Sequence, residues 1–448
     1  MTSTDAYYKK MTETPVSRLI VSLGIPTTIS MLVTSIYNMA DTYFVGELGE
    51  SQQAATGILF TLQAIIQAVA FMLGQGSGTM VSKALADKNK NEASEYVSTA
   101  FFTALGAGSV LMILGLIFIN PFMRFLGSTE TILPYARQYG FWVLVAAPFM
   151  TCSFVLNNNL RYEGKSFFAM IGLVTGGILN IFGDYLLIRV LKLGVFGAGL
   201  STAASQVVGF ILLLVFHRKT AQGVISIKHI SRKLSVIGTI ARVGFPALIR
   251  QGLASISNGL LNNLTKPFGD AAIAAMSVVN RYSMLVMCVG LGIGQGFQPV
   301  ASINSQARKY DRVKKGLLFT MTVGVVLVGV MSLPGLIFPE QIVALFQKAE
   351  EVQKIGGFAL RCASIGVLFH PLSIPVNMLY QSIRKAGISS FLSMIRSGLM
   401  LIPTLIITTS LWGLIGIQIS QPVADIFTGL ISIPFIIAFL RKPDDKMT

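Results

Sequence analysis

Long apolar runs separated by short polar connections make up almost the whole chain. Each run is at least as long as the roughly 20 residues that a helix needs to cross the hydrocarbon core of a bilayer. The runs lack the two-residue alternation that a membrane β-strand would show. The pattern therefore predicts an all-α membrane protein with twelve transmembrane helices, over residues 16–43, 53–83, 93–119, 133–157, 167–190, 195–216, 236–265, 272–305, 314–338, 355–381, 387–410 and 414–440.

The second half of the chain repeats the first at an offset of 220 residues. Fourteen of the 59 positions from Gly24 to Ser82 are identical to their counterparts without a gap, including Gly-Gln-Gly at 74–76 and at 294–296. Each half holds six predicted helices, and because six is even, both halves enter the membrane with the same orientation. The sequence therefore predicts two six-helix bundles, an N-terminal lobe over 1–216 and a C-terminal lobe over 236–448, joined by a linker over 217–235.

Composition and charge support a membrane location. Hydrophobic residues make up 53% of the chain and charged residues only 12%, about half of the usual charged share. The net charge of +16 does not indicate nucleic-acid binding, because Lys and Arg gather in every second connection. By the positive-inside rule, these connections and both termini face the cytoplasm. Basic residues on that side are concentrated at Lys83 to Lys90, Arg161/Lys165, Arg218 to Lys233, Arg308 to Lys315, Arg384/Lys385 and Arg441/Lys442.

Signatures of energy-coupling enzymes and of catalysis are weak. Gly164-Lys165-Ser166 ends like a phosphate-binding loop, but Asn159 stands where the first glycine belongs and no strand precedes it. His370 adjoins a proline within a predicted helix, and we expect it to bond backbone at a kink. Cys152, Cys288 and Cys362 lie in predicted helices and are interpreted as apolar fillers. The sequence therefore predicts that the protein is no enzyme, uses no ATP and carries no cofactor.

Acidic residues inside predicted helices are the most informative polar positions. Asp41 shares a helix face with Asn38, and Asp184 follows Asn180 by one turn. A carboxylate at the bilayer centre costs about 2.5–3.5 kcal/mol on insertion scales, so such residues are candidates for function. Together with Thr202 they offer hard oxygen ligands, suited to Na⁺ or a shared proton. The alternative is that the two acids only hydrogen-bond across helices and hold the lobe together.

These residues and motifs resemble the MATE (multidrug and toxic compound extrusion) family of secondary transporters, most closely its bacterial MepA-like and DinF-like branches. The resemblance rests on the duplicated halves, on Pro26 to Gly46, on both Gly-Gln-Gly motifs, and on paired glycine-rich segments at 194–201 and 413–420. It implies a V-shaped protein that exports substrates in exchange for Na⁺ or H⁺ by alternating access. It also implies a cation site in the N-terminal lobe, formed by Asp41, Asn180, Asp184 and Thr202 with Asn157 nearby, and no other metal.

Substrates and partners are predicted less sharply. Arg250, Arg281 and Arg396 lie in C-terminal helices in which Asp425 is the one obvious counter-ion. One arginine is expected to pair with Asp425 and one to reach an interface, and the remaining one could bind an anionic group in a cleft. Structural roles for all three arginines are the alternative. We expect a substrate cleft with contributions from Asn38, Arg250, Asn258, Arg281 and Arg396, and a helix hinge at Pro26.

The predicted protein is a monomer in the bacterial plasma (inner) membrane. Its expected partners are membrane lipids and small molecules, organic cations in the first place and zwitterions or anions in the second, with no nucleic acid. The main alternative is a flippase for lipid-linked head groups, which would need basic residues lining both lobes. An integral-membrane enzyme would need clustered acids or histidines at one interface. A passive channel would need more polar residues along a pore.

Overall fold

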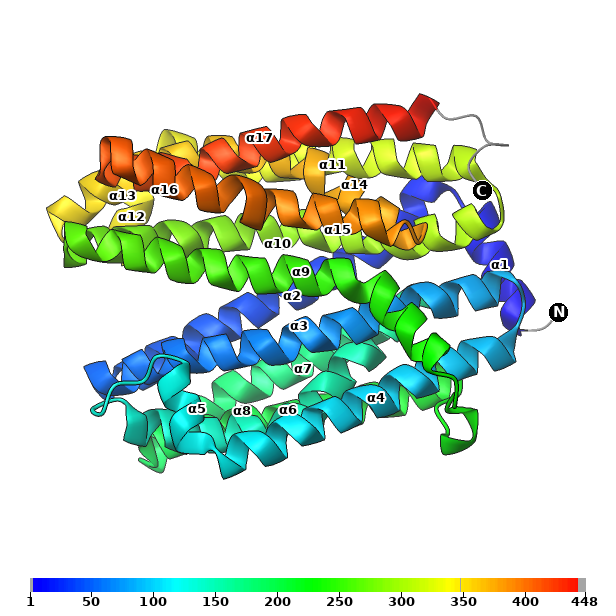
Figure 1. Cartoon of the computed structure of the whole chain (residues 1–448), viewed down its shortest axis with the longest axis horizontal. Helices are drawn as coiled ribbons and strands as arrows, with labels where there is room; N and C mark the ends of the chain where they lie inside the picture. Colours follow the sequence, from blue (N-terminus) through cyan, green and yellow to red (C-terminus); the bar gives the residue numbers. More distant parts are fainter. Residues whose placement is uncertain (1–2, 347, 442–448) are drawn as a thin grey trace. The chain divides into compact units, whose positions relative to one another are not determined.

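The computed structural model describes residues 3–346 and 348–441, and every regular element in these ranges is helical (Figure 1). The helices are α1 (Ser3–Glu13), α2 (Val16–Gly46), α3 (Glu50–Ala86), α4 (Lys90–Ile117), α5 (Ile119–Phe125), α6 (Leu133–Tyr162), α7 (Ser166–Asp184), α8 (Gly194–Thr220), α9 (Leu234–Thr265), α10 (Asp270–Gln306), α11 (Tyr310–Ile337), α12 (Pro339–Phe346), α13 (Glu350–Gly366), α14 (His370–Ser382), α15 (Ala386–Met394), α16 (Leu401–Trp412) and α17 (Leu414–Arg441).

Within the described ranges, eleven helical segments are long and apolar enough to cross a membrane, compared with the twelve that the sequence predicts. The difference is α9, which has 32 residues but is not among the eleven. Its length suffices, but Arg242, Arg250 and several asparagines make it more polar than the others. With α9 added, the long helices number 11 + 1 = 12.

The chain forms two compact units that do not coincide with its two sequence halves. The first unit comprises Met1–Met11 and Ile29–Leu248, and the second comprises Thr12–Thr28 and the chain from Ile249 onward. Helix α2 therefore begins in the second unit and enters the first at Ile29, whereas α9 makes the opposite passage at Ile249. Because these units follow contacts rather than the repeat, the lobe boundaries at 216 and 236 stay predictions.

The repeated Gly-Gln-Gly motif explains how each exchanged half-helix packs. A Cβ added at Gly76 would lie 2.1 Å from the carbonyl oxygen of Ile240 in α9, and one added at Gly296 would lie 2.5 Å from Cα of Gly24 in α2. Real Cβ atoms do not approach backbone so closely, so glycine is required where these helices cross. The motif is therefore a packing device, repeated because the packing is repeated.

Turn geometry also follows the repeat. Lys88 and Arg308, which lie 308 − 88 = 220 residues apart, have φ values of 57° and 56°. Gly164 and Arg384, also 384 − 164 = 220 apart, have φ values of 72° and 62°. Non-glycine residues adopt this left-handed conformation infrequently, so it marks a turn that both halves share.

The short helix α1 and the segment after α8 are tied to the first unit. The hydroxyl of Tyr7 donates to the carbonyl of Tyr162 at 2.7 Å. The buried Glu163 carboxylate accepts from the backbone N–H groups of Gln222 at 2.5 Å and Gly223 at 3.2 Å. Burial raises the pKa of Glu163 to about 7, against its ordinary value of 4.5. The sequence analysis assigns no element to α1, because its polar residues show no long apolar run.

Candidate functional site

Four helices of the first unit bring polar side chains into one buried network. Asp41 lies on α2, Tyr139 on α6, Asn180 on α7 and Thr202 on α8. The Tyr139 hydroxyl donates to Asp41 Oδ2 at 2.7 Å and lies 3.1 Å from Thr202 Oγ1. The Asn180 amide donates to Thr202 Oγ1 at 3.2 Å. Since Tyr139 has one proton and gives it to Asp41, Thr202 donates to Tyr139, and the chain of bonds runs from Asn180 to Asp41.

Several oxygen atoms at this network have no donor among the described residues. They are Asp41 Oδ1, Asn180 Oδ1 and both carboxylate oxygens of Asp184. All three side chains are buried, with Asp184 at 0% exposure. Asp41 and Asp184 also interact electrostatically, so their charges repel. Buried acceptors and charges are normally satisfied by a donor or a counter-ion. The arrangement therefore suits a small cation, either Na⁺ or a proton.

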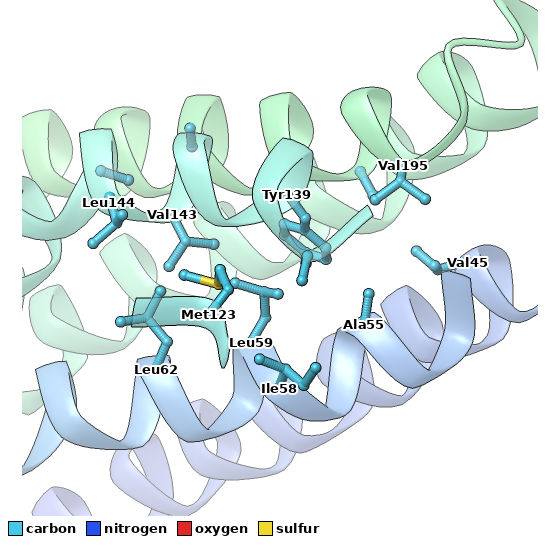
Figure 2. Packing of buried hydrophobic residues seen from close by; sticks show 14 of the residues in the cluster. Val45, Ala55, Ile58, Leu59, Leu62, Met123, Tyr139, Val143, Leu144 and Val195 are labelled. Carbon is cyan, nitrogen blue, oxygen red and sulfur yellow. The ribbon is translucent and has the colours of Figure 1, made fainter. Parts of the chain in front are cut away.

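An apolar cluster surrounds one side of the network. Tyr139 is 1% exposed and belongs to this cluster, so its ring packs among aliphatic side chains while its hydroxyl reaches the polar groups. Figure 2 shows Tyr139 with neighbours from α2, α3, α5, α6 and α8, namely Val45, Ala55, Ile58, Leu59, Leu62, Met123, Val143, Leu144 and Val195. Apolar surroundings lower the local dielectric constant, which strengthens every charge interaction within the network.

Close packing of α7 against α8 allows these residues to meet. A Cβ added at Gly183 would lie 2.5 Å from Ser201 Oγ, and Gly176 faces Gly209. Ser201 in turn donates to the carbonyl of Asn180 at 3.0 Å. Directly after Asp184 the backbone becomes π-helical over Tyr185–Val190. Such stretches are rare and frequent at functional sites, because they redirect side chains.

The structure modifies the predicted cation site in two ways. Tyr139 is at its centre, yet sequence reasoning missed it, since a single tyrosine in an apolar helix has no distinctive pattern. A signal was the tyrosine hydroxyl itself, which needs a partner when buried in a membrane helix. Asn157 was expected near the site, but its amide donates to the carbonyl of Ala169 at 3.1 Å, and its contacts lie outside the network.

A second charged cluster lies in the second unit. Arg396 Nε donates to Asp425 Oδ1 at 2.9 Å, and His370 Nε2 lies 3.0 Å from Asp425 Oδ2. Arg396 is the arginine that pairs with Asp425, as one of the three was expected to do. The expectation for His370 was wrong, because its partner is a carboxylate rather than backbone. A buried carboxylate attracts the nearest hydrogen-bond donors, and α14 holds the imidazole against α17.

The other residues of the predicted substrate cleft do not form one cluster. Arg250 Nη1 donates to Asn377 Oδ1 at 3.2 Å. Asn258 is exposed, and Asn38 and Arg281 are half-buried. Neither the described hydrogen bonds nor the described ion pairs join these side chains to Arg396. Within the described ranges there is also no group of three or more His, Cys, Asp or Glu side chains that could hold a metal ion, and all three cysteines are free.

Two exchanged helical repeats, eleven apolar spans and buried intramembrane acids define a polytopic membrane transporter. The MatE family model matches the chain twice, at residues 26–186 and 246–407. The two matches start 246 − 26 = 220 residues apart, which is the offset of the internal repeat. The chain therefore belongs to the MatE family, whose relatives named below are transporters and export proteins rather than enzymes.

Similar proteins cover nearly the whole chain. "Multidrug export protein MepA" of Staphylococcus haemolyticus (strain JCSC1435) is 25% identical over 436 residues, 96% of this chain and 95% of that protein. A solved MOP superfamily transporter from Pyrococcus furiosus Vc1 has a TM-score of 0.88, with 25% identity and coverage of 97% and 98%. A MATE structure in complex with MaD5 has a TM-score of 0.87, with 26% identity and coverage of 97% and 99%. These similarities confirm the predicted all-α, twelve-helix fold.

Proposed function

We propose that this protein is a cation-coupled exporter of small organic molecules that works by alternating access. The relatives named multidrug export proteins support export. They do not favour a lipid-linked flippase, and the network in the first unit contains acids and neutral groups rather than the basic residues that a flippase would need. We place the protein in the bacterial plasma membrane as a monomer among membrane lipids, with both termini in the cytoplasm.

The set of buried oxygen atoms without donors carries this proposal. Asp41, Asn180 and Asp184 present four such atoms beside the Thr202 hydroxyl. A Na⁺ ion would take oxygen ligands from this set, and a proton would instead be shared between the two carboxyl groups. Either cation removes the repulsion between Asp41 and Asp184. Its binding can bias the transporter only by its difference in affinity between two conformations.

Pro26 is the proposed hinge of α2, and the unit boundaries support a second one. The passage from one unit to the other falls between Thr28 and Ile29 in α2, two residues after Pro26. In α9 it falls between Leu248 and Ile249, again two residues after a proline, Pro246. Proline removes one backbone hydrogen bond of a helix, which makes bending easier at that point. Matched hinges would let both units change orientation together.

Substrates with an anionic group are proposed beside the organic cations expected for the family. Asp425 uses Nε of Arg396, whereas Nη1 contacts only the sulfur of Met287 at 3.1 Å, and a thioether is a weak acceptor. The Arg396 side chain remains 24% exposed. An arginine within a membrane span normally faces protein or water rather than lipid. Its remaining donors could therefore bind a substrate carboxylate.

Efflux from proteoliposomes tests the coupling. Wild type should export when either a Na⁺ gradient or a pH gradient is imposed alone, and the effective gradient identifies the ion. Asp41→Asn and Asp184→Asn should each abolish gradient-driven export while the protein still inserts. Glu130→Gln is the control, because that acid is 78% exposed in a surface ion pair with Arg124. Full efflux by both variants would contradict the assignment, and loss of inserted protein would favour a purely structural role.

The substrate proposal needs a separate comparison. A carboxylate substrate and its methyl ester are exported by wild type and by Arg396→Gln/Asp425→Asn, a double variant that leaves no unpaired charge. We expect the double variant to lose export of the carboxylate alone. Equal losses for both substrates would mean that Arg396 and Asp425 are structural.

A further inference from the structure

A polar cavity lies where α1 meets the turn between α3 and α4. It has a volume of about 520 Å³, within the range of small-molecule sites. All of its lining residues belong to the first unit, and they are Thr4, Asp5, Lys88, Asn89, Lys90 and Asn91. The cavity lies outside the membrane spans, on the side that the basic connections assign to the cytoplasm. It is separate from the network around Asp41, and the proposed transport cycle does not use it.

The backbone of the turn gives this cavity a positive character. Helix α4 has 28 residues and begins at Lys90, so its first amide groups point toward the cavity. Asn89 satisfies one of them, because its side chain accepts from the N–H of Glu92 at 3.1 Å. The remaining first-turn amides and the helix dipole favour an anion.

The balance of side-chain charge also favours an anion. Lys88 and Lys90 face a single acid in the lining, Asp5, which lies 2.7 Å from the Lys88 amine. This carboxylate raises the pKa of Lys88, so that lysine stays charged. The two other acids near the turn, Asp87 and Glu92, are within 4 Å of Lys83, at 3.4 and 3.6 Å. The lining therefore carries one net positive charge, which matches a singly charged anion.

One buried hydroxyl in the cavity has no partner. Thr4 is only 3% exposed, and its Oγ1 has no hydrogen-bond partner among the described residues. Leaving a buried hydroxyl unbonded costs free energy, so such a group indicates a ligand or a site of strain. Because Thr4 lines the cavity opposite a helix N-terminus, a phosphate oxygen between them would satisfy both. This observation is independent of the helix dipole.

We infer that the cavity between α1 and the α3–α4 turn binds a phosphate group. The Lys88 and Lys90 amines and the first-turn amides of α4 supply charge and donors, and the Thr4 hydroxyl supplies a further hydrogen bond. A phosphodiester with one negative charge suits the lining better than a doubly charged monoester. The phosphate could belong to a phospholipid headgroup or to a free phosphate compound. In both cases the ligand would join α1 to the turn and strengthen the contact that Asp5 and Lys88 already make.

Thermal unfolding of the full-length protein in detergent tests this inference and separates the two sources. Inorganic phosphate and dihexanoylphosphatidylglycerol are titrated separately, with phosphate-free dihexanoylglycerol as the control. Stabilisation by the phospholipid alone identifies a headgroup, and stabilisation by inorganic phosphate alone identifies a free anion. Both results support the site. The inference is overturned if neither compound stabilises, or if the phosphate-free lipid stabilises equally.

Variants show whether the ligand binds in this cavity. Lys88→Gln/Lys90→Gln should weaken binding at least tenfold, whereas Arg308→Gln, at the equivalent turn of the second repeat, should leave it unchanged. Asp5→Asn should tighten phosphate binding, because it removes a competing carboxylate. A weaker affinity in Asp5→Asn would instead indicate a cationic ligand and would overturn the inference.

Thr4→Val separates a ligand-binding hydroxyl from a strained one. Valine has the same shape without the hydroxyl, so it should weaken phosphate binding about tenfold if Thr4 contacts the ligand. If Thr4 has no such contact, removal of an unbonded hydroxyl should raise the melting temperature and leave the affinity unchanged. The second result contradicts the inference. Each measurement uses binding rather than transport, so its failure would leave the proposed export function unaffected.

Discussion

Removal of a single hydroxyl at Tyr139 is the most direct perturbation of the proposed cation site. In Tyr139→Phe the ring is retained, so the apolar cluster around it stays packed. The variant loses the donor to Asp41 Oδ2 at 2.7 Å and the contact with Thr202 at 3.1 Å. Asp41 already has one oxygen without a donor, and in the variant both would lack one.

The expected magnitude follows from the kind of bond that is lost. A hydrogen bond to a charged group contributes about 1.5–3 kcal/mol, which corresponds to a factor of roughly 10 to 150 in an equilibrium constant. Without this donor Asp41 loses its orientation toward the other ligands. We therefore expect the apparent affinity for the coupling cation to change by at least about tenfold. Maximal export at a saturating cation gradient should change less.

Cation-dependent efflux and cation-dependent thermal stabilisation both measure this affinity. Tyr135→Phe is the matched control, because Tyr135 lies one turn earlier on α6 and packs against the same cluster. An affinity in Tyr139→Phe equal to that of wild type, with Tyr135→Phe also unchanged, would refute the role of the network. Equal losses in both variants would indicate a general packing effect instead.

The remaining predictions concern packing, charge and pH. Gly296→Ala should prevent normal accumulation of folded protein, because its Cβ would meet backbone at 2.5 Å, whereas Gly259→Ala, with no atom within 4 Å, should accumulate like wild type. Arg396→Gln should destabilise by about 3 kcal/mol by leaving the buried Asp425 charge without its arginine, and Arg396→Gln/Asp425→Asn should regain most of the melting temperature. Burial raises the pKa of Glu163 from 4.5 to about 7, so its stabilising contribution is complete below pH 4.5 and disappears as pH rises through 7. Relative to Glu163→Gln, wild type should therefore lose about 3 kcal/mol of unfolding free energy across this window, and equal pH profiles would contradict the assignment.

Much of the fold can be predicted from the sequence, because the bilayer restricts what an apolar run can do. Runs of this length must form helices, since unpaired backbone groups are too costly in lipid. The repeat is equally visible, because Gly76 and Gly296 are needed for the same close packing in both halves. The polar helix α9 and the short helix α1 were harder to assign, because hydropathy alone does not distinguish them from connections.

The sequence by itself determined that the protein is a duplicated helical membrane protein and that Asp41, Asn180 and Asp184 are candidates for function. A carboxylate within a membrane span is costly enough to be noticed without a structure. Only the tertiary structure decided which side chains meet. It brought Tyr139 to Asp41 across 98 positions of the chain, directed Asn157 away from the site, and paired His370 with Asp425. These contacts depend on how helices rotate and cross, and that is set by packing between distant segments rather than by the local pattern.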